Sequence, residues 1–248
     1  MSHKYILNPK HTAFKKHLLE IPTIFQASDE SIHKARNELK IVEIDGVKYV
    51  IKSFKVPHLL NRIAYTFFRD GKAKKSYLNA VKLQELDVNT PEPIGVIEYF
   101  QNGLLSESYF VSLYEPYDFT IREVFHHKVE DVETILKAFA HFTYTLHKKG
   151  VWHVDYSLGN ILITKEDAQN YRFSLVDINR MEFKEISAKE GLRNLNKFWA
   201  QEKDLQFLVK EYAKLSDLDF NEAYAIVKES VQKIEKTKEL KNYLKNKK

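Results

Sequence analysis

Near the middle of the chain, residues 153–162 read His153-Val154-Asp155-Tyr156-Ser157-Leu158-Gly159-Asn160-Ile161-Leu162, and they indicate the fold more clearly than any other segment. Seventeen residues beyond Asn160, an apolar run over residues 173–176 leads into Asp177. The first stretch has the form H-x-D-x-x-x-x-N, and the second is typical of a buried strand that ends at an aspartate. Each feature alone occurs by chance, but their combination at this spacing makes Asp155, Asn160 and Asp177 candidate site residues.

Phosphoryl transfer from Mg-ATP needs side chains of these three kinds, because catalysis consists mainly of positioning the reactants and neutralising charge. Asp155 stands where a carboxylate would orient the acceptor hydroxyl and take its proton. The Asn160 amide oxygen can ligate Mg²⁺ without adding a second charge beside that base. Asp177 would hold the metal that bridges the phosphates. For His153 we expect a structural role in the loop.

An upstream lysine fits the same chemistry. Two β-rich runs, residues 38–44 and 47–54, flank Asp45-Gly46, which is a strong hairpin signal. The second run contains Tyr49-Val50-Ile51-Lys52, similar to the V-A-I-K strand whose lysine contacts the α- and β-phosphates. A lysine in a strand is usually a solvated surface residue. The position of Lys52 at the end of a hairpin, well before Asp155, favours the functional interpretation.

The composition of the chain limits the chemistry and the cellular location that can be expected. The chain has 248 residues, no cysteine and a formal net charge of +5. Disulfides and thiol chemistry are therefore excluded, and a reducing compartment is expected. Residues 1–14 lack the apolar core of a signal peptide, and no stretch approaches 18 apolar residues. We expect one catalytic unit and a cytoplasmic location.

The order of predicted elements indicates an α+β protein with two lobes. Residues 1–115 would form a small antiparallel sheet with one helix, the latter over residues 72–86. Strands are expected near residues 94–100 and 109–114, across an Asn102-Gly103 turn. Residues 116–248 would form a mainly helical second lobe that carries the catalytic loop. The chain between the lobes includes Glu115, whose backbone would face the adenine.

Two helices of the second lobe have readable ends. Thr120-Ile121-Arg122-Glu123 matches a capping box that opens a short helix. A longer helix follows, and Gly150 is expected to end it. The apolar residues that define its buried face are Ile135, Phe139, Phe142 and Leu146.

With these residues in place, the chain resembles the lipopolysaccharide kinase family, whose members phosphorylate Kdo or heptose sugars of the lipid A inner core. The resemblance extends over about residues 36–195. Its most specific parts are Arg36-Asn37-Glu38, residues 49–55, Asn89-Thr90-Pro91-Glu92-Pro93-Ile94, residues 153–162, Val176-Asp177-Ile178-Asn179-Arg180 and Arg193-Asn194-Leu195. The resemblance implies a protein-kinase-like fold with an abbreviated C-terminal lobe, and ATP and Mg²⁺ as cofactors. The usual glycine two residues after Asp177 is Asn179 here.

The resemblance also implies an acceptor that is a sugar, lipid-linked or free, and not a protein. No A-P-E motif follows Asp177, and residues 180–193 are too few for a regulated activation loop. No G-x-G-x-x-G precedes Lys52 either. Donors around Arg36 and Asn37 would cover the phosphates instead, as the family's pattern allows.

The helix over residues 72–86 departs from the kinase pattern. It should supply a glutamate that pairs with Lys52, yet the aligned position is Leu78. Glu85, two turns later on the same face, is the one acidic residue well inside the helix. Three hypotheses stay open: the alignment is shifted, Glu85 is the partner, or Lys52 lacks its usual partner and activity is impaired.

Positive charge is concentrated between Lys52 and Lys75, where seven basic residues accompany a single acidic one, Asp70. Apolar residues recur at helical spacing over residues 56–68, so this segment has the pattern of a basic amphipathic helix. It could pack as ordinary core. Alternatively, residues 56–75 contact the anionic cytoplasmic face of the inner membrane, which would suit a lipid-linked acceptor.

Other functions share parts of this pattern. A compact serine/threonine kinase or a small-molecule phosphotransferase, such as one acting on antibiotics, would use the same machinery. A pseudokinase that serves as a binding module would explain Leu78 and Asn179. Basic patches alone indicate nucleic-acid binding only weakly, since they also suit lipid phosphates, and we expect no nucleic-acid partner. The sequence does not indicate an oligomeric state.

Overall fold

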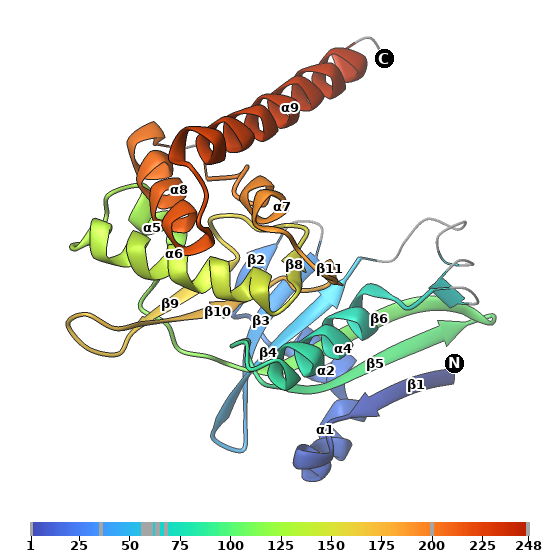
Figure 1. Cartoon of the computed structure of the whole chain (residues 1–248). Helices are drawn as coiled ribbons and strands as arrows, with labels where there is room; N and C mark the ends of the chain where they lie inside the picture. Colours follow the sequence, from blue (N-terminus) through green and yellow to red (C-terminus); the bar gives the residue numbers. More distant parts are fainter. Residues whose placement is uncertain are drawn as a thin grey trace. The chain divides into compact units, whose positions relative to one another are not determined.

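The computed structural model describes residues 2–34, 37–55, 62, 65–66, 69–198 and 201–246. The chain divides into two compact units (Figure 1). The first comprises Met1–Pro116 together with Asp177–Arg180, and the second comprises Tyr117–Val176 and Met181–Lys248. The short segment Asp177–Arg180 therefore belongs to a different unit from the residues that flank it in sequence.

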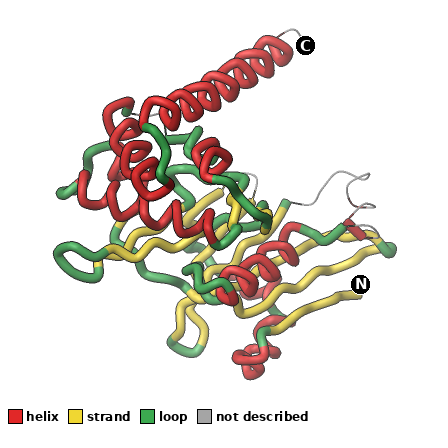
Figure 2. The backbone as a smooth tube through the Cα atoms, viewed as in Figure 1, coloured by secondary structure: helices red, strands yellow, loops and turns green. Residues whose placement is uncertain are grey.

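A six-stranded antiparallel sheet forms the first unit, in the order β1-β5-β6-β4-β3-β2. The strands are β1 (Ser2–Leu7), β2 (Ser31–Lys34), β3 (Asn37–Ile44), β4 (Val47–Phe54), β5 (Pro93–Gln101) and β6 (Leu104–Leu113). Figure 2 draws the strands in yellow, and the longest of them are β5 and β6. The four central strands are the four predicted for this unit, whereas the edge strands β1 and β2 were not predicted.

Both predicted hairpins are confirmed by the turns that join their strands. Asp45 and Gly46 between β3 and β4 have φ values of 52° and 76°, and Asn102 and Gly103 between β5 and β6 have φ values of 52° and 75°. Positive φ at both central residues is the requirement of the tight turn that matches strand twist. Aspartate, asparagine and glycine tolerate it best, which is why these two dipeptides determine where the strands reverse.

Helices cover the sheet of the first unit. The short elements η1 (Pro9–Phe14), α1 (Lys15–Leu19) and α2 (Ile21–Ala27) lie at the start of the chain, and α4 (Lys72–Glu85) packs against β4, β5 and β6. One buried cluster joins the early helices to the sheet; its members are Phe14, Leu18, Ile21, Phe25, Ile51, Ile94, Ile97, Tyr109 and Val111. Since neighbouring residues of a strand point to opposite faces, Lys52 lies on the face opposite to Ile51. The predicted helix 72–86 is confirmed, whereas the early helices were not predicted.

The second unit is mainly helical, with two small antiparallel sheets in the orders β10-β9-β7 and β11-β8. Its strands are β7 (Phe119–Thr120), β8 (Val151–His153), β9 (Ile161–Lys165), β10 (Tyr171–Leu175) and β11 (Met181–Phe183). Its helices are α5 (Ile121–Phe125), α6 (Val132–Lys148), α7 (Ala188–Arg193), α8 (Glu202–Ser216) and α9 (Phe220–Asn246). None of the helices in the described ranges is long and apolar enough to cross a bilayer.

Local signals in this unit formed as predicted. The Thr120 side chain caps α5, and Glu123 binds back to the Thr120 backbone, which completes the capping box. Helix α6 ends before Gly150, whose φ of +73° suits a glycine after the last turn. Fully buried aromatic residues form the centre of the unit; they include Phe125, Phe139, Tyr156, Phe198 and Tyr212.

Candidate active site

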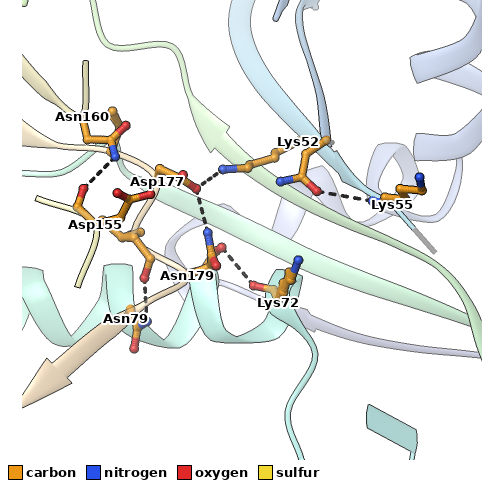
Figure 3. A network of polar contacts seen from close by, with 12 residues as sticks. Lys52, Lys55, Lys72, Asn79, Asp155, Asn160, Asp177 and Asn179 are labelled. Carbon is orange, nitrogen blue, oxygen red and sulfur yellow. Dashed lines mark hydrogen bonds and ion pairs between the residues drawn. The ribbon is translucent and has the colours of Figure 1, made fainter. Parts of the chain in front are cut away.

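Lys52 on β4 is almost fully buried, with 9% of its surface exposed, and its ammonium group donates a short hydrogen bond to Asp177 Oδ1 (Figure 3). The Asn179 Nδ2 group donates to the same carboxylate oxygen over 2.7 Å. Two of the predicted site residues, Lys52 and Asp177, are thus brought together over 125 positions of sequence within the first unit. Asn179, at the position of the usual glycine, contributes a donor that glycine could not.

The segment around Asp177 is held in an unusual conformation. Asp177 has a φ of +55°, in the left-handed region, which aspartate tolerates better than most residues other than glycine. Such conformations persist where surrounding contacts hold them, and they are concentrated at functional sites. One of these contacts comes from α4, where the Asn79 Nδ2 group donates to the Ile178 carbonyl oxygen over 2.6 Å (Figure 3).

These contacts answer the question of the partner of Lys52 in this structure. Glu85 pairs instead with Lys82 on its own helix, at 3.0 Å, and its side chain is 58% exposed. Leu78 is 41% exposed. The hypothesis that Glu85 pairs with Lys52 is therefore wrong here. Helix α4 acts on the site through Asn79, which holds the Asp177 segment that carries the counter-ion of Lys52.

We predict that Glu85→Gln and Leu78→Glu each leave turnover near that of the wild type, because exposed substitutions usually change stability by less than about 0.5 kcal/mol. Asn79→Ala should lower turnover several-fold, because a lost hydrogen bond of about 1 kcal/mol loosens the Asp177 segment. Steady-state rates of the three variants would test this. A strong loss in Glu85→Gln with no loss in Asn79→Ala would contradict the assignment.

The second unit holds the remaining catalytic candidates, Asp155 and Asn160, in the loop between β8 and β9. The Asn160 Nδ2 group donates to the Asp155 carbonyl oxygen over 2.9 Å (Figure 3). This contact orients the side-chain amide so that its oxygen points away from that carbonyl. The backbone N–H of Asp155 donates to His153 Nδ1 over 3.1 Å.

His153 has the structural role that was predicted for it. Because its Nδ1 accepts a hydrogen bond, the proton is on Nε2, which donates to the Val176 carbonyl oxygen over 3.0 Å. The imidazole, which is fully buried, thus ties the Asp155 loop to the residue before Asp177.

A residue that the sequence did not reveal also contacts the candidate base. Lys197, which follows α7, donates a short hydrogen bond from its ammonium group to Asp155 Oδ1. It lies 42 positions from Asp155, and no motif in the sequence marks it. The nearest signal was the Arg193-Asn194-Leu195 stretch, a few residues upstream.

Asn194 connects the loop to a buried polar network. Its Nδ2 group donates to the His153 carbonyl oxygen over 3.1 Å, and its Oδ1 lies 3.3 Å from His147 Nε2. His147 Nδ1 lies 2.9 Å from the Tyr212 hydroxyl. Since Asn194 Oδ1 can only accept, His147 carries its proton on Nε2 and Tyr212 donates to Nδ1. A Cβ atom on Gly191 would lie 2.5 Å from His147 Nδ1, so the close approach of α7 requires glycine.

Burial lowers the pKa of His147 to about 4, against weaker opposing effects of Asn194 and Glu190. The unfolded chain should bind this proton near pH 6.5. The folded state therefore binds fewer protons between these values, so its stability falls as the pH is lowered from about 6.5 to about 4.

We predict a loss of up to about 3 kcal/mol across that window. Urea unfolding at several pH values would measure it. His147→Gln should flatten the slope between about pH 6.5 and pH 5, above the range in which ordinary carboxylates titrate. An unchanged slope would contradict the assignment.

For the other predicted site residues, the structure gives little evidence about their roles. Arg36 and most of residues 56–68 lie outside the described residues, so the expected phosphate donor and amphipathic helix are not described. Asn37 begins β3, and its Oδ1 accepts from the Lys55 backbone N–H over 3.4 Å. Glu115 is half-buried and follows β6, near the boundary between the two units. The roles assigned to these residues stay predictions.

No group of three or more His, Cys, Asp or Glu side chains that could hold a metal is found in the described part of the chain. The oxygen donors that the sequence predicts for Mg²⁺ are Asp177 in the first unit and Asn160 in the second, and this role stays a prediction.

Comparison with known proteins gives the family. Residues 112–218 match the model of the lipopolysaccharide kinase (Kdo/WaaP) family. The matched segment contains Asp155, Asn160 and Asp177 at the spacing described above. This segment, less than half of the chain, is similar to the lipopolysaccharide kinase family. The protein is therefore a kinase, a phosphotransferase that acts on an alcohol group of a sugar or another small molecule. No curated protein matched the sequence.

Two solved structures resemble the kinase. One, described as "WaaP in complex with acyl carrier protein", matches with a TM-score of 0.61 at 15% identity, covering 93% of this chain and 98% of that chain. The other, of a microcompartment-associated aminopropanol kinase, has a TM-score of 0.46 at 12% identity, covering 81% and 80%. At this identity the first likeness establishes the fold, and it confirms the predicted α+β, kinase-like class.

Proposed function

We propose that this kinase transfers the γ-phosphoryl group of ATP, with Mg²⁺, to a hydroxyl of a Kdo or heptose sugar in the lipopolysaccharide inner core. The observation that carries the proposal is the family match, since it covers the segment in which Asp155, Asn160 and Asp177 lie. The short segment between Arg180 and α7 adds support, because it is too short for a peptide-binding activation loop.

In this proposal, residues of the first unit bind the nucleotide. Lys52 binds the α- and β-phosphates. In this structure its ammonium group donates to the Asp177 carboxylate, and phosphate oxygens would take the place of that carboxylate when nucleotide binds. Asn37 and Arg36 cover the phosphates, and the backbone at Glu115 faces the adenine. Asn37 and Lys52 lie on the neighbouring inner strands β3 and β4, and Glu115 follows the inner strand β6.

The donors present fit Mg²⁺. This hard cation prefers oxygen ligands and is usually held by one or two protein side chains together with nucleotide phosphates. Asp177 would supply a carboxylate and Asn160 an amide oxygen. When bound, the ion would neutralise charge on the phosphates. Asn79 and Asn179 act on Asp177 itself, by fixing its backbone and its carboxylate.

Asp155 acts on the acceptor. Its carboxylate accepts a hydrogen bond from the sugar hydroxyl and takes its proton as the hydroxyl oxygen attacks phosphorus. His153 and Asn160 fix the loop that carries it, through the contacts at 3.1 Å and 2.9 Å. Because the backbone of Asp155 is fixed, its carboxylate is held in the orientation that the acceptor hydroxyl needs. Holding reacting groups in this way raises the rate of transfer.

We also propose that residues 56–75 contact the anionic cytoplasmic face of the inner membrane, where a lipid-linked acceptor would be presented. Support comes from the local excess of positive charge and from the described start of α4, where Lys74 is 37% exposed and pairs with Asp70 at 2.6 Å. Polybasic segments bind anionic surfaces in a salt-dependent way. Flotation with anionic and with neutral vesicles would separate membrane binding from a purely cytoplasmic protein.

The experiment that tests the function is incubation with ATP, Mg²⁺ and Kdo-lipid A, followed by mass analysis of the lipid. We expect one added phosphate on the sugar, and no addition on lipid A that lacks Kdo and heptose. A heptose-bearing core tested in parallel would decide between the two sugars. Phosphate found only on added protein, with none on either lipid, would overturn the assignment of the acceptor.

A further inference from the structure

We propose that Lys197 is a catalytic residue of this kinase, whose ammonium group binds the phosphoryl group during its transfer while Asp155 takes the proton of the acceptor. The inference rests on the proposed function only in that ATP is the phosphoryl donor. It does not depend on which alcohol receives the phosphate.

The contact itself is direct. Lys197 Nζ donates to Asp155 Oδ1, the carboxylate that must meet the acceptor. The two side chains are 32% and 37% exposed, so a substrate can reach both. A surface ion pair of this exposure would contribute little to stability, typically less than about 1 kcal/mol. Stability alone therefore does not explain why a lysine is placed on this aspartate.

The placement is fixed by the buried residues next to each partner. Tyr156 adjoins Asp155 and Phe198 adjoins Lys197, and both aromatic side chains are fully buried. Their rings pack against each other edge to face, with centroids 5.4 Å apart. The Tyr156 hydroxyl also shares a hydrogen bond of 2.8 Å with Thr143 on α6. The core thus anchors both backbones, and the ion pair is pre-organised by tertiary packing.

The positive charge of Lys197 suits a second partner besides Asp155, namely the negatively charged phosphoryl group. When the acceptor hydroxyl binds Asp155, it competes for the carboxylate that Lys197 occupies. The phosphoryl group arrives at the same acceptor oxygen and carries negative charge on three non-bridging oxygens. A base lies within about 3 Å of the hydroxyl that it deprotonates. An ammonium group in contact with that base therefore lies within reach of the phosphoryl oxygens.

In the resulting step, the acceptor oxygen forms a bond to the γ-phosphorus, and the bond from that phosphorus to the β,γ-bridging oxygen breaks. The bridging oxygen keeps the electron pair and leaves as part of ADP. The hydroxyl proton passes to Asp155. Lys197 stays protonated throughout and donates hydrogen bonds to the phosphoryl oxygens, which stabilises the charge that develops there.

The test compares ADP with ADP–aluminium fluoride, a planar mimic of the transferring phosphoryl group, in the presence of Mg²⁺ and without a sugar. We expect Lys197→Ala to bind ADP as the wild type does but to lose about 10²-fold in affinity for ADP–aluminium fluoride. Lys197→Arg should retain part of that affinity. Lys214→Ala is the matched control, since Lys214 is 59% exposed and pairs with Glu211 within α8.

The rate of turnover is a second readout. It can be measured with any alcohol that the kinase phosphorylates, or as hydrolysis of ATP, in which water is the acceptor. Lys197→Ala should lower kcat with little change in the KM for ATP, and ethylamine should restore part of the rate by replacing the missing ammonium group. Equal affinity of wild type and Lys197→Ala for ADP–aluminium fluoride would overturn the inference. So would a loss of rate that follows a lower melting temperature and is not rescued by ethylamine. Failure to phosphorylate Kdo-lipid A would instead refute the proposed acceptor.

Discussion

Asp155→Ala is expected to slow phosphoryl transfer by about 10²- to 10⁴-fold, the usual contribution of a general base. Nucleotide affinity should stay near that of the wild type, because this carboxylate acts on the acceptor. Asp155→Asn should be nearly as slow, since an amide keeps the shape of the side chain but cannot take the proton. Product formation under saturating ATP, together with calorimetry of nucleotide binding, would measure the two effects separately.

The structure sharpens this experiment, because Asp155 is also the partner of Lys197. The double variant Asp155→Ala/Lys197→Ala should be little slower than the single variants if the two side chains act in one step, since residues that work as a unit are non-additive. Lys214→Ala serves as the control for loss of a paired lysine. Turnover of Asp155→Ala within about threefold of the wild type would reject the assignment of the base.

Asp177→Ala should weaken Mg²⁺-dependent nucleotide binding by about 10- to 100-fold. Loss of an interaction with a charged group costs about 1.5–3 kcal/mol, which corresponds to that factor in Kd. The apo protein should also lose stability, because Lys52 is nearly buried and its ion-pair partner is removed. Calorimetry with and without Mg²⁺ and a denaturant titration would report the two consequences.

A comparison with Asn179→Gly separates the roles at this carboxylate. The glycine variant keeps Asp177 but removes the donor at 2.7 Å, so its affinity should fall less than that of Asp177→Ala. Lys52→Met should relieve the buried charge and, in combination with Asp177→Ala, recover part of the lost stability. Unchanged affinity of Asp177→Ala for nucleotide with Mg²⁺ present would exclude this residue as a ligand.

Much of the local structure followed from the sequence because its causes are local. Asp45-Gly46 and Asn102-Gly103 reverse the chain, since few other residues adopt two successive positive φ values. Thr120 and Glu123 open α5 by bonding to each other's backbone within one turn. The H-x-D-x-x-x-x-N stretch predicted a structured loop for a similar reason. Its residues His153, Asp155 and Asn160 form hydrogen bonds with one another within eight positions.

The contacts between distant parts of the chain were decided by the tertiary structure. Lys52 and Asp177 are 125 positions apart, and Asp155 and Lys197 are 42 apart. Periodicity and turn signals describe neighbours along the chain, so they do not say which distant side chains will meet. The partner of Lys52 was sought on α4 because kinases place a glutamate there. In this protein Asn79 has the corresponding influence, through a backbone carbonyl that no sequence pattern marks.

The reaction class and the elements that carry the candidate residues could therefore be predicted from the sequence. The candidates are Lys52, Asp155, Asn160 and Asp177. Only the tertiary structure decided that Asp177 neutralises Lys52, and that Tyr156 and Phe198 bring Lys197 to Asp155. The Asp155–Lys197 pair joins two partly exposed side chains, and an ion pair of this kind is too weak to direct folding. Burial of the aromatic residues beside it is strong enough to do so, and it depends on the whole core.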